Sequence, residues 1–138
     1  MNFQNPSEEQ IKTLLQKART IAVVGLSPRP ERPSHRIARR LKDWGYRIIP
    51  VRPGIDSVLG EKAYARLRDV PVPLDIVDVF RAASLVDAVV DECIAIHAPA
   101  LWIQLGIVNE PAAERARAAG IFTVMDRCIS VDYRRLMS

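Results

Sequence analysis

The residues best suited to chemistry lie in one short loop, GLSPRPERPS, which spans residues 25–34. Arg29 and Arg32 carry guanidinium groups, whose forked N–H donors match the oxygens of a phosphate. Ser34 begins an expected helix, where a hydroxyl and free backbone N–H groups also stabilise an anion. The three prolines of the loop restrict φ and leave it little entropy to lose on binding. The loop therefore predicts a site for a phosphate-bearing ligand.

Positive charge gathers around this loop. Eight basic and two acidic residues lie between Arg29 and Arg52, so this segment carries +6 while the whole chain carries +4. A local basic patch on a nearly neutral body favours a phosphate-bearing partner. A plain solvating role is expected for four of the basic residues, namely Arg39, Arg40, Lys42 and Arg47.

The elements that must position this loop alternate along the chain. Apolar runs predict strands at residues 20–24, 46–51, 74–80, 100–105 and 121–125. Helices are expected between them and at both ends, with N-caps at Ser7, Ser34, Ser84 and Asn109. Residues 57–70 are expected to form a loop with a short helical piece. Alternation of this kind indicates parallel strands joined by right-handed crossovers.

The predicted fold class is α/β, a single Rossmann-like domain over residues 1–138. Its doubly wound parallel sheet has about five strands in the order 3-2-1-4-5. Such sheets bind ligands outside the carboxyl ends of their strands, where the strand order reverses. With this order, the reversal lies between the first and fourth strands. The candidate site is the set of loops that follow Gly25, Val51, Phe80, Leu105 and Met125.

A nicotinamide dinucleotide fits this site poorly. Its binding motif needs several glycines for close approach to the pyrophosphate, and only Gly25 is present. The motif also needs an acidic residue after the second strand, where this chain has Arg52. NAD is disfavoured on both counts. NADP is compatible with the arginine but still lacks the glycines.

Five motifs together resemble a known family. They are VGLSPRPERPS, PVRP, DIVDVFR, WIQLG and MDRC, one at each strand in this order. From about residue 11 to 136, the chain resembles the small stand-alone coenzyme A-binding proteins. It is also similar to the N-terminal domain of the succinyl-CoA synthetase alpha subunit.

The resemblance implies a Rossmann-like fold with coenzyme A across the carboxyl edge of the sheet. It implies that Arg52 and Pro53 border the pocket, that Phe80 and Arg81 close it, and that Gln104 and Gly106 line the path of the thiol-bearing arm. The loop over the nucleotide end would comprise Gly25, Ser27, Pro28, Arg29, Arg32, Pro33 and Ser34. The family usually has Asn at the position of Arg52, so this chain departs from the pattern there. The pyrophosphate and 3′-phosphate of coenzyme A suit an arginine-rich loop.

No catalytic constellation stands out. His35 is expected either at an exposed helix start or near a phosphate, and His97 at a helix end. Asp75 and Asp78 have an odd separation on a strand, so they cannot face the same way. Cys128 is expected to be structural, and a mixed disulfide with coenzyme A is the minority alternative.

Three function classes stay open from the sequence. The preferred one is a non-catalytic protein that binds coenzyme A or acyl-CoA. The second is an NADP- or acyl-CoA-dependent enzyme component that needs a partner chain. The third is a nucleic-acid binder that uses the patch from Arg29 to Arg52, but this patch lacks aromatics for base stacking, because Trp44 falls on an apolar helix face.

The composition indicates the class of protein and the cellular compartment to expect. The chain is 49% hydrophobic and 26% charged, ordinary for a globular domain. No apolar run reaches the roughly 20 residues of a membrane helix, and the polar start does not fit a signal peptide. Cys93 and Cys128 show no metal-ligand spacing, and no metal site is expected. A cytoplasmic protein with reduced thiols is the expectation.

Overall fold

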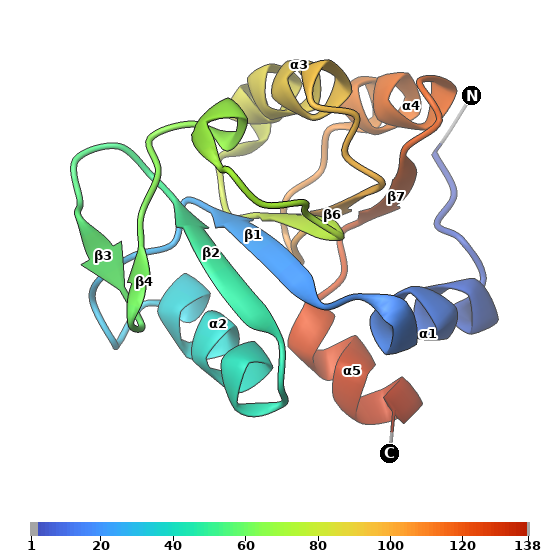
Figure 1. Ribbon diagram of the computed structural model, residues 1–138. Coiled ribbons are helices and arrows are strands. Elements are labelled where there is room, and N and C mark those ends of the chain that lie inside the picture. The colour runs from blue at the N-terminus through green and yellow to red at the C-terminus, as the bar shows by residue number, and fades with distance from the viewer. Residues whose placement is uncertain (1–2, 138) are drawn as a thin grey trace.

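Five parallel strands form one sheet at the centre of the molecule (Figure 1). The computed structural model describes residues 3–137. The strands are β1 (Thr20–Val24), β2 (Arg47–Val51), β5 (Ile76–Val79), β6 (Ala100–Ile103) and β7 (Phe122–Met125). Almost every residue in them is buried, as expected where helices cover both faces of a sheet. The α/β, Rossmann-like class predicted from the sequence is confirmed.

The strand order differs from the expected 3-2-1-4-5. It is β2-β1-β5-β6-β7, so the third predicted strand, β5, pairs with β1 and leaves β2 at the edge. Pro50 in β2 gives a physical reason, because proline cannot donate to a ladder and is confined to edge strands. Its carbonyl accepts from Tyr64 N (3.0 Å) on the side away from β1, so its missing donor falls at that outer edge. The reversal of strand order therefore lies between β1 and β5.

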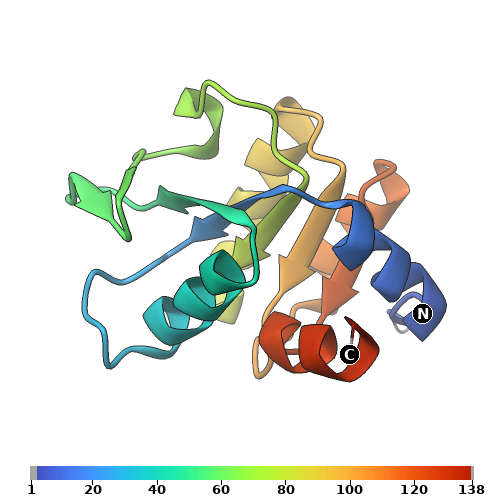
Figure 2. The ribbon, with the colours of Figure 1, turned by 60° about the horizontal axis from the view of Figure 1, so that its bottom comes forward.

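Helices cover both faces of the sheet (Figures 1 and 2). On one face lie α1 (Glu8–Lys17), α2 (Pro33–Asp43) and α5 (Ile129–Met137), and on the other α3 (Val86–Ala95) and α4 (Glu110–Ala118). The two apolar clusters between sheet and helices make up the core, with Trp102 fully buried on the α5 side. None of the helices described is long and apolar enough to traverse a bilayer.

Two of the four expected helix caps are found. Ser7 forms a capping box with Gln10, and the Asn109 side chain accepts from Ala112 N. Ser34 is not a cap, because Pro33 occupies the first turn of α2 and the N-cap is Arg32. Proline at the first helical position has the φ that a helix needs, so the N-cap lies two residues earlier than expected.

The Ser84 cap is also wrong. A 3₁₀ turn, η2 (Ala83–Leu85), precedes α3, which begins at Val86. Residues 57–70, expected to be a loop with a short helical piece, contain a small hairpin, β3 (Ser57–Val58) and β4 (Glu61–Lys62), and the 3₁₀ turn η1 (Leu67–Asp69). This segment returns the chain from the edge strand β2 to β5.

Candidate functional site

The carboxyl ends of β1, β2 and β5 meet at Gly25. This glycine has φ +86°, and a Cβ built on it would lie 2.3 Å from the Phe80 carbonyl oxygen. Its N–H donates to Val51 O at 2.9 Å. Only glycine suits both the backbone conformation and the close approach. Gly25 therefore brings the loops after these three strands together at the point where the strand order reverses.

Buried polar contacts fix the loop that follows Gly25. Ser27 N donates to Ser34 Oγ (3.0 Å), and His35 Nδ1 donates to Ser27 O (2.9 Å). Ser27 Oγ accepts from Arg29 N at 3.1 Å. The side chain of Ser34 therefore ties the loop to α2. His35 is expected at an exposed helix start or near a phosphate. It is instead buried, and its ring hydrogen-bonds to the loop at Ser27 O.

A pocket of about 400 Å³ opens above this loop. Eight of the thirteen predicted site residues line it: Gly25, Ser27, Arg29, Arg32, Pro33, Ser34, Arg52 and Phe80. Within residues 3–137 no other residue lines this pocket, and no carboxylate is among the eight. Three arginines thus share a concave surface with two serines, an arrangement suited to an anion.

The three arginines are held differently. Arg29 forms a 2.8 Å ion pair with Glu31, but both side chains are mostly exposed, so the pair contributes at most about 1 kcal/mol and does not prevent a contact with phosphate. Arg32 stands at the N-cap of α2, whose first-turn N–H groups favour negative charge. Arg52 is half-buried, and its backbone N–H donates to Tyr64 O at 2.7 Å.

The other five predicted residues do not line this pocket. Pro28 and Pro53 are exposed next to lining residues, and Arg81 follows Phe80. Gln104 is buried, and its Oε1 accepts from Ile129 N at 3.1 Å. Gly106 N donates to Asp126 Oδ1 at 2.8 Å. Gln104 and Gly106 thus join the loops after β6 and β7, and their contact with a ligand stays a prediction.

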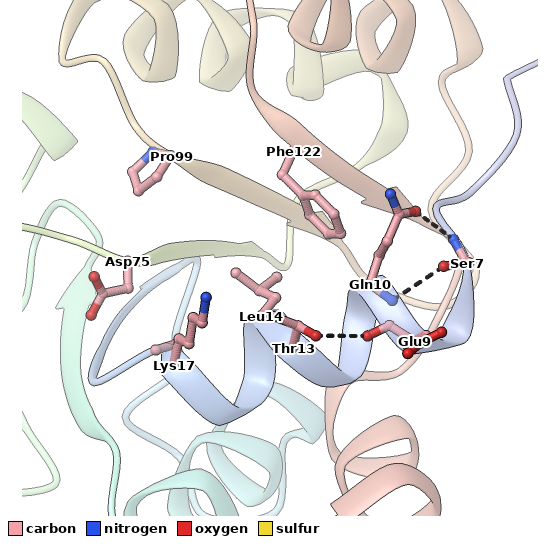
Figure 3. A pocket seen from close by; sticks show the side chains of 10 residues that line it. Ser7, Glu9, Gln10, Thr13, Leu14, Lys17, Asp75, Pro99 and Phe122 are labelled. Atoms are coloured by element: carbon pink, nitrogen blue, oxygen red, sulfur yellow. Dashed lines mark hydrogen bonds between the residues drawn. The ribbon is translucent and has the colours of Figure 1, made fainter.

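A larger pocket, of about 570 Å³, lies at the opposite edge of the sheet (Figure 3). Side chains of α1, such as Leu14 and Lys17, face Asp75, Pro99 and Phe122 across it. These last three residues lie at the amino ends of strands or just before them. Ligands of open parallel sheets bind at the carboxyl edge, so we assign the candidate site to the arginine-lined pocket.

Asp78 is a functional candidate that the sequence reasoning missed. Its side chain is fully buried in the middle of the sheet, and neither carboxyl oxygen has a hydrogen-bond partner. Burial raises the pKa of this carboxyl well above its usual value, and the nearby Cys128 raises it further. Asp75 faces the other way and accepts from Arg19 N (2.8 Å) and Thr20 N (3.0 Å), as the odd separation predicts.

No metal centre accompanies these groups in residues 3–137. Nowhere in that range do three or more His, Cys, Asp or Glu side chains gather as metal ligands would. His97 is exposed at the end of α3, with φ +55°. The arginine-lined pocket at the carboxyl edge and the buried Asp78 near Cys128 are two candidate functional features of this chain.

Fold and pocket together define a Rossmann-like domain with an arginine-lined pocket at the carboxyl edge of its sheet. The family model described as a CoA binding domain matches residues 19–134. The chain belongs to this family of CoA-binding domains, and the resemblance seen in the sequence is confirmed.

Several relatives are similar along most or part of the chain. An uncharacterized protein of Bacillus subtilis, YneT, is 46% identical over 129 residues, covering 94% of this chain and 96% of that protein. A hypothetical protein of Pyrococcus horikoshii has a solved structure with a TM-score of 0.92 at 32% identity, covering all of both chains. An ADP-forming acetate–CoA ligase of Methanocaldococcus jannaschii is 28% identical over 75 residues, 54% of this chain but 11% of the ligase.

Proposed function

We propose that this chain binds coenzyme A or an acyl-CoA in the arginine-lined pocket, with Arg29, Arg32 and Arg52 contacting its phosphates. The observation that carries the proposal is that these three arginines line one pocket together with Ser27 and Ser34. Membership of the CoA-binding domain family supports the same ligand. Charge-assisted hydrogen bonds to phosphate are strong and directional, so they favour coenzyme A over a neutral metabolite.

We propose a binding role rather than a catalytic one. The eight residues that line the pocket include no histidine, cysteine or carboxylate, so its serine hydroxyls lack a general base beside them that could activate them as nucleophiles. Their groups are suited to hold phosphates without changing them. The covalent chemistry of the acetate–CoA ligase relative belongs to a protein of which this chain matches 11%.

The first test is isothermal titration calorimetry with coenzyme A and with its 3′-dephospho form. A hydrogen bond to a charged group contributes about 1.5–3 kcal/mol, so loss of the 3′-phosphate should weaken binding roughly 10-fold or more. Equal affinities for the two compounds would contradict a role for the arginines at that phosphate.

The second test compares Arg32→Ala with Arg39→Ala. Arg32 lines the pocket, whereas Arg39 is exposed two turns further along α2 and does not line it. Arg32→Ala should weaken coenzyme A binding about 10-fold or more, and Arg39→Ala should change it little. Equal small losses would place the ligand elsewhere. Equal losses of DNA or RNA binding, without specific coenzyme A binding, would favour a broad nucleic-acid surface.

A further inference from the structure

Cys128 occupies an unusual position for a structural cysteine. It lies between β7 and α5, where its carbonyl accepts the first helical hydrogen bond from Asp132 N at 3.0 Å. Its sulfur lies 3.2 Å from Ser130 Oγ and is only partly buried. Ser130, Val131 and Gln104 surround the sulfur closely enough to lower the pKa of the thiol. The thiol therefore caps the N-terminus of a nine-residue helix, where a negative sulfur is stabilised.

Burial and hydrogen bonding shift the pKa of the Cys128 thiol in opposite directions. Burial alone would raise the pKa of the Cys128 thiol, but the hydrogen bonds from Ser130, Val131 and Gln104 outweigh it and lower that pKa below its usual value. The Gln104 side chain is held at the start of α5, because its Oε1 accepts from Ile129 N at 3.1 Å.

Asp78 provides a second, independent observation at the same place. It is paired in register with Trp102 of β6, so both side chains lie on the face covered by α5. Trp102 Nε1 donates at 2.8 Å to the carbonyl of Arg127, the residue before Cys128. The fully buried Asp78 carboxyl thus lies beneath the start of α5, without a hydrogen-bond partner of its own. A buried carboxyl in this state holds its proton and is a hydrogen-bond donor that lacks an acceptor.

Other titratable groups near the start of α5 have hydrogen-bond partners. The buried Asp132 bonds to Arg127 Nε at 2.7 Å and to Arg135 Nη2 at 3.1 Å. Asp126 accepts from Gly106 N, and His35 of α2 donates to Ser27 O. Among these groups Asp78 is therefore the one without a hydrogen-bond partner, and a negative charge on it beside a Cys128 thiolate is disfavoured.

We propose that Cys128 is a reactive thiolate that captures a low-molecular-weight thiol by thiol–disulfide exchange. The Cys128 sulfur attacks one sulfur of a small disulfide, R–S–S–R′. A new bond forms between Cys128 and R–S, the original S–S bond breaks, and R′–S⁻ leaves and takes a proton from solvent. Sulfur oxidation states balance, because the incoming disulfide is the oxidant. The identity of R–S as coenzyme A rests on the proposed function; the reactivity of Cys128 does not.

The test uses the purified protein, coenzyme A disulfide and glutathione disulfide, with intact-mass spectrometry as the readout. Wild type should gain one coenzyme A adduct that dithiothreitol removes, and Cys128→Ser should gain none. Cys93→Ser is the matched control and should react like wild type, since Cys93 is fully buried and burial raises the pKa of its thiol to about 12. An unmodified wild type, or an equally modified Cys128→Ser variant, would overturn the proposal.

The two disulfides separate this proposal from the proposed function. Coenzyme A disulfide reacting at least about 10-fold faster than glutathione disulfide would support both. Equal rates at Cys128 would support the reactive thiolate and contradict coenzyme A as its partner.

Alkylation by iodoacetamide provides a readout without any ligand. The rate at Cys128 should reach half its maximum below pH ~8.5, the usual pKa of a free thiol. Ser130→Ala removes one hydrogen bond to the sulfur and should move this midpoint upward. A midpoint at or above that of a free thiol in wild type would contradict a stabilised thiolate.

Discussion

Replacement of Gly25 by alanine should destabilise the protein more than any other Gly→Ala change at a similar backbone angle. The added Cβ would lie 2.3 Å from the Phe80 carbonyl oxygen, far inside van der Waals contact. That oxygen belongs to the backbone, and the N–H of the same residue donates a hydrogen bond to Val24 O at 2.9 Å. The Phe80 carbonyl therefore cannot rotate away as a side chain could. Relief requires the ends of β1 and β5 to separate.

The magnitude follows from two contributions. The positive φ of Gly25 costs an alanine about 1–2 kcal/mol. Overpacking at a site that cannot relax freely adds about 1–3 kcal/mol. Gly120 has φ +88° with no atom within 4 Å of its would-be Cβ, so Gly120→Ala carries the first cost without the second. The difference between the variants should therefore be about 1–3 kcal/mol, or roughly 4–12 °C in Tm for a domain of this size.

Urea denaturation followed by circular dichroism measures both variants against wild type. The m-value should stay the same, so that a change in midpoint reports stability alone. Equal losses for Gly25→Ala and Gly120→Ala would refute the reasoning, because they would mean that the close approach of β1 and β5 contributes nothing.

Two further predictions concern Asp78 and catalysis. Burial raises the folded-state pKa of Asp78, so wild-type stability should fall as pH rises from about 4 toward that raised pKa, by up to about 1.4 kcal/mol per pH unit, whereas Asp78→Asn should lack this loss. Denaturation at pH 5 and pH 7 tests this, and a pH-independent difference between the two proteins would contradict it. Acyl-CoA formation from ATP and a carboxylate, or hydride transfer with NADPH, should be undetectable for the chain alone in coupled spectrophotometric assays; turnover in either assay would contradict a purely binding role.

The fold class could be predicted from the sequence, but the strand order could not be taken from the fold class alone. Alternating apolar runs and turn residues identify five buried strands, and this local pattern is the same for both common orders of a doubly wound sheet. The signal that separates them was present at Pro50. A proline inside a strand places that strand at the edge, and only the observed order leaves β2 there.

Part of the candidate site could likewise be predicted from the sequence, and part of it could not. Strand ends and loop chemistry locate the edge and single out Arg29, Arg32 and Ser34, and the resemblance to the family supplies the other lining residues. Ser34 was assigned the wrong local role, because the proline before it starts the helix and frees its hydroxyl for Ser27. Asp78 could not be identified as a candidate, because no local pattern shows that a carboxyl within an apolar strand will find no partner.

Both features of the carboxyl edge have one explanation if a single ligand spans them. The arginine pocket lies at the ends of β1, β2 and β5, and Cys128 follows β7. From β1 to β7 there are three strand spacings, roughly 14 Å at about 4.8 Å each. Coenzyme A has phosphates at one end and a thiol at the other, joined by a flexible arm. NADP has the phosphates but no thiol. It could therefore pair with the arginines but would offer no sulfur that could form a disulfide with Cys128.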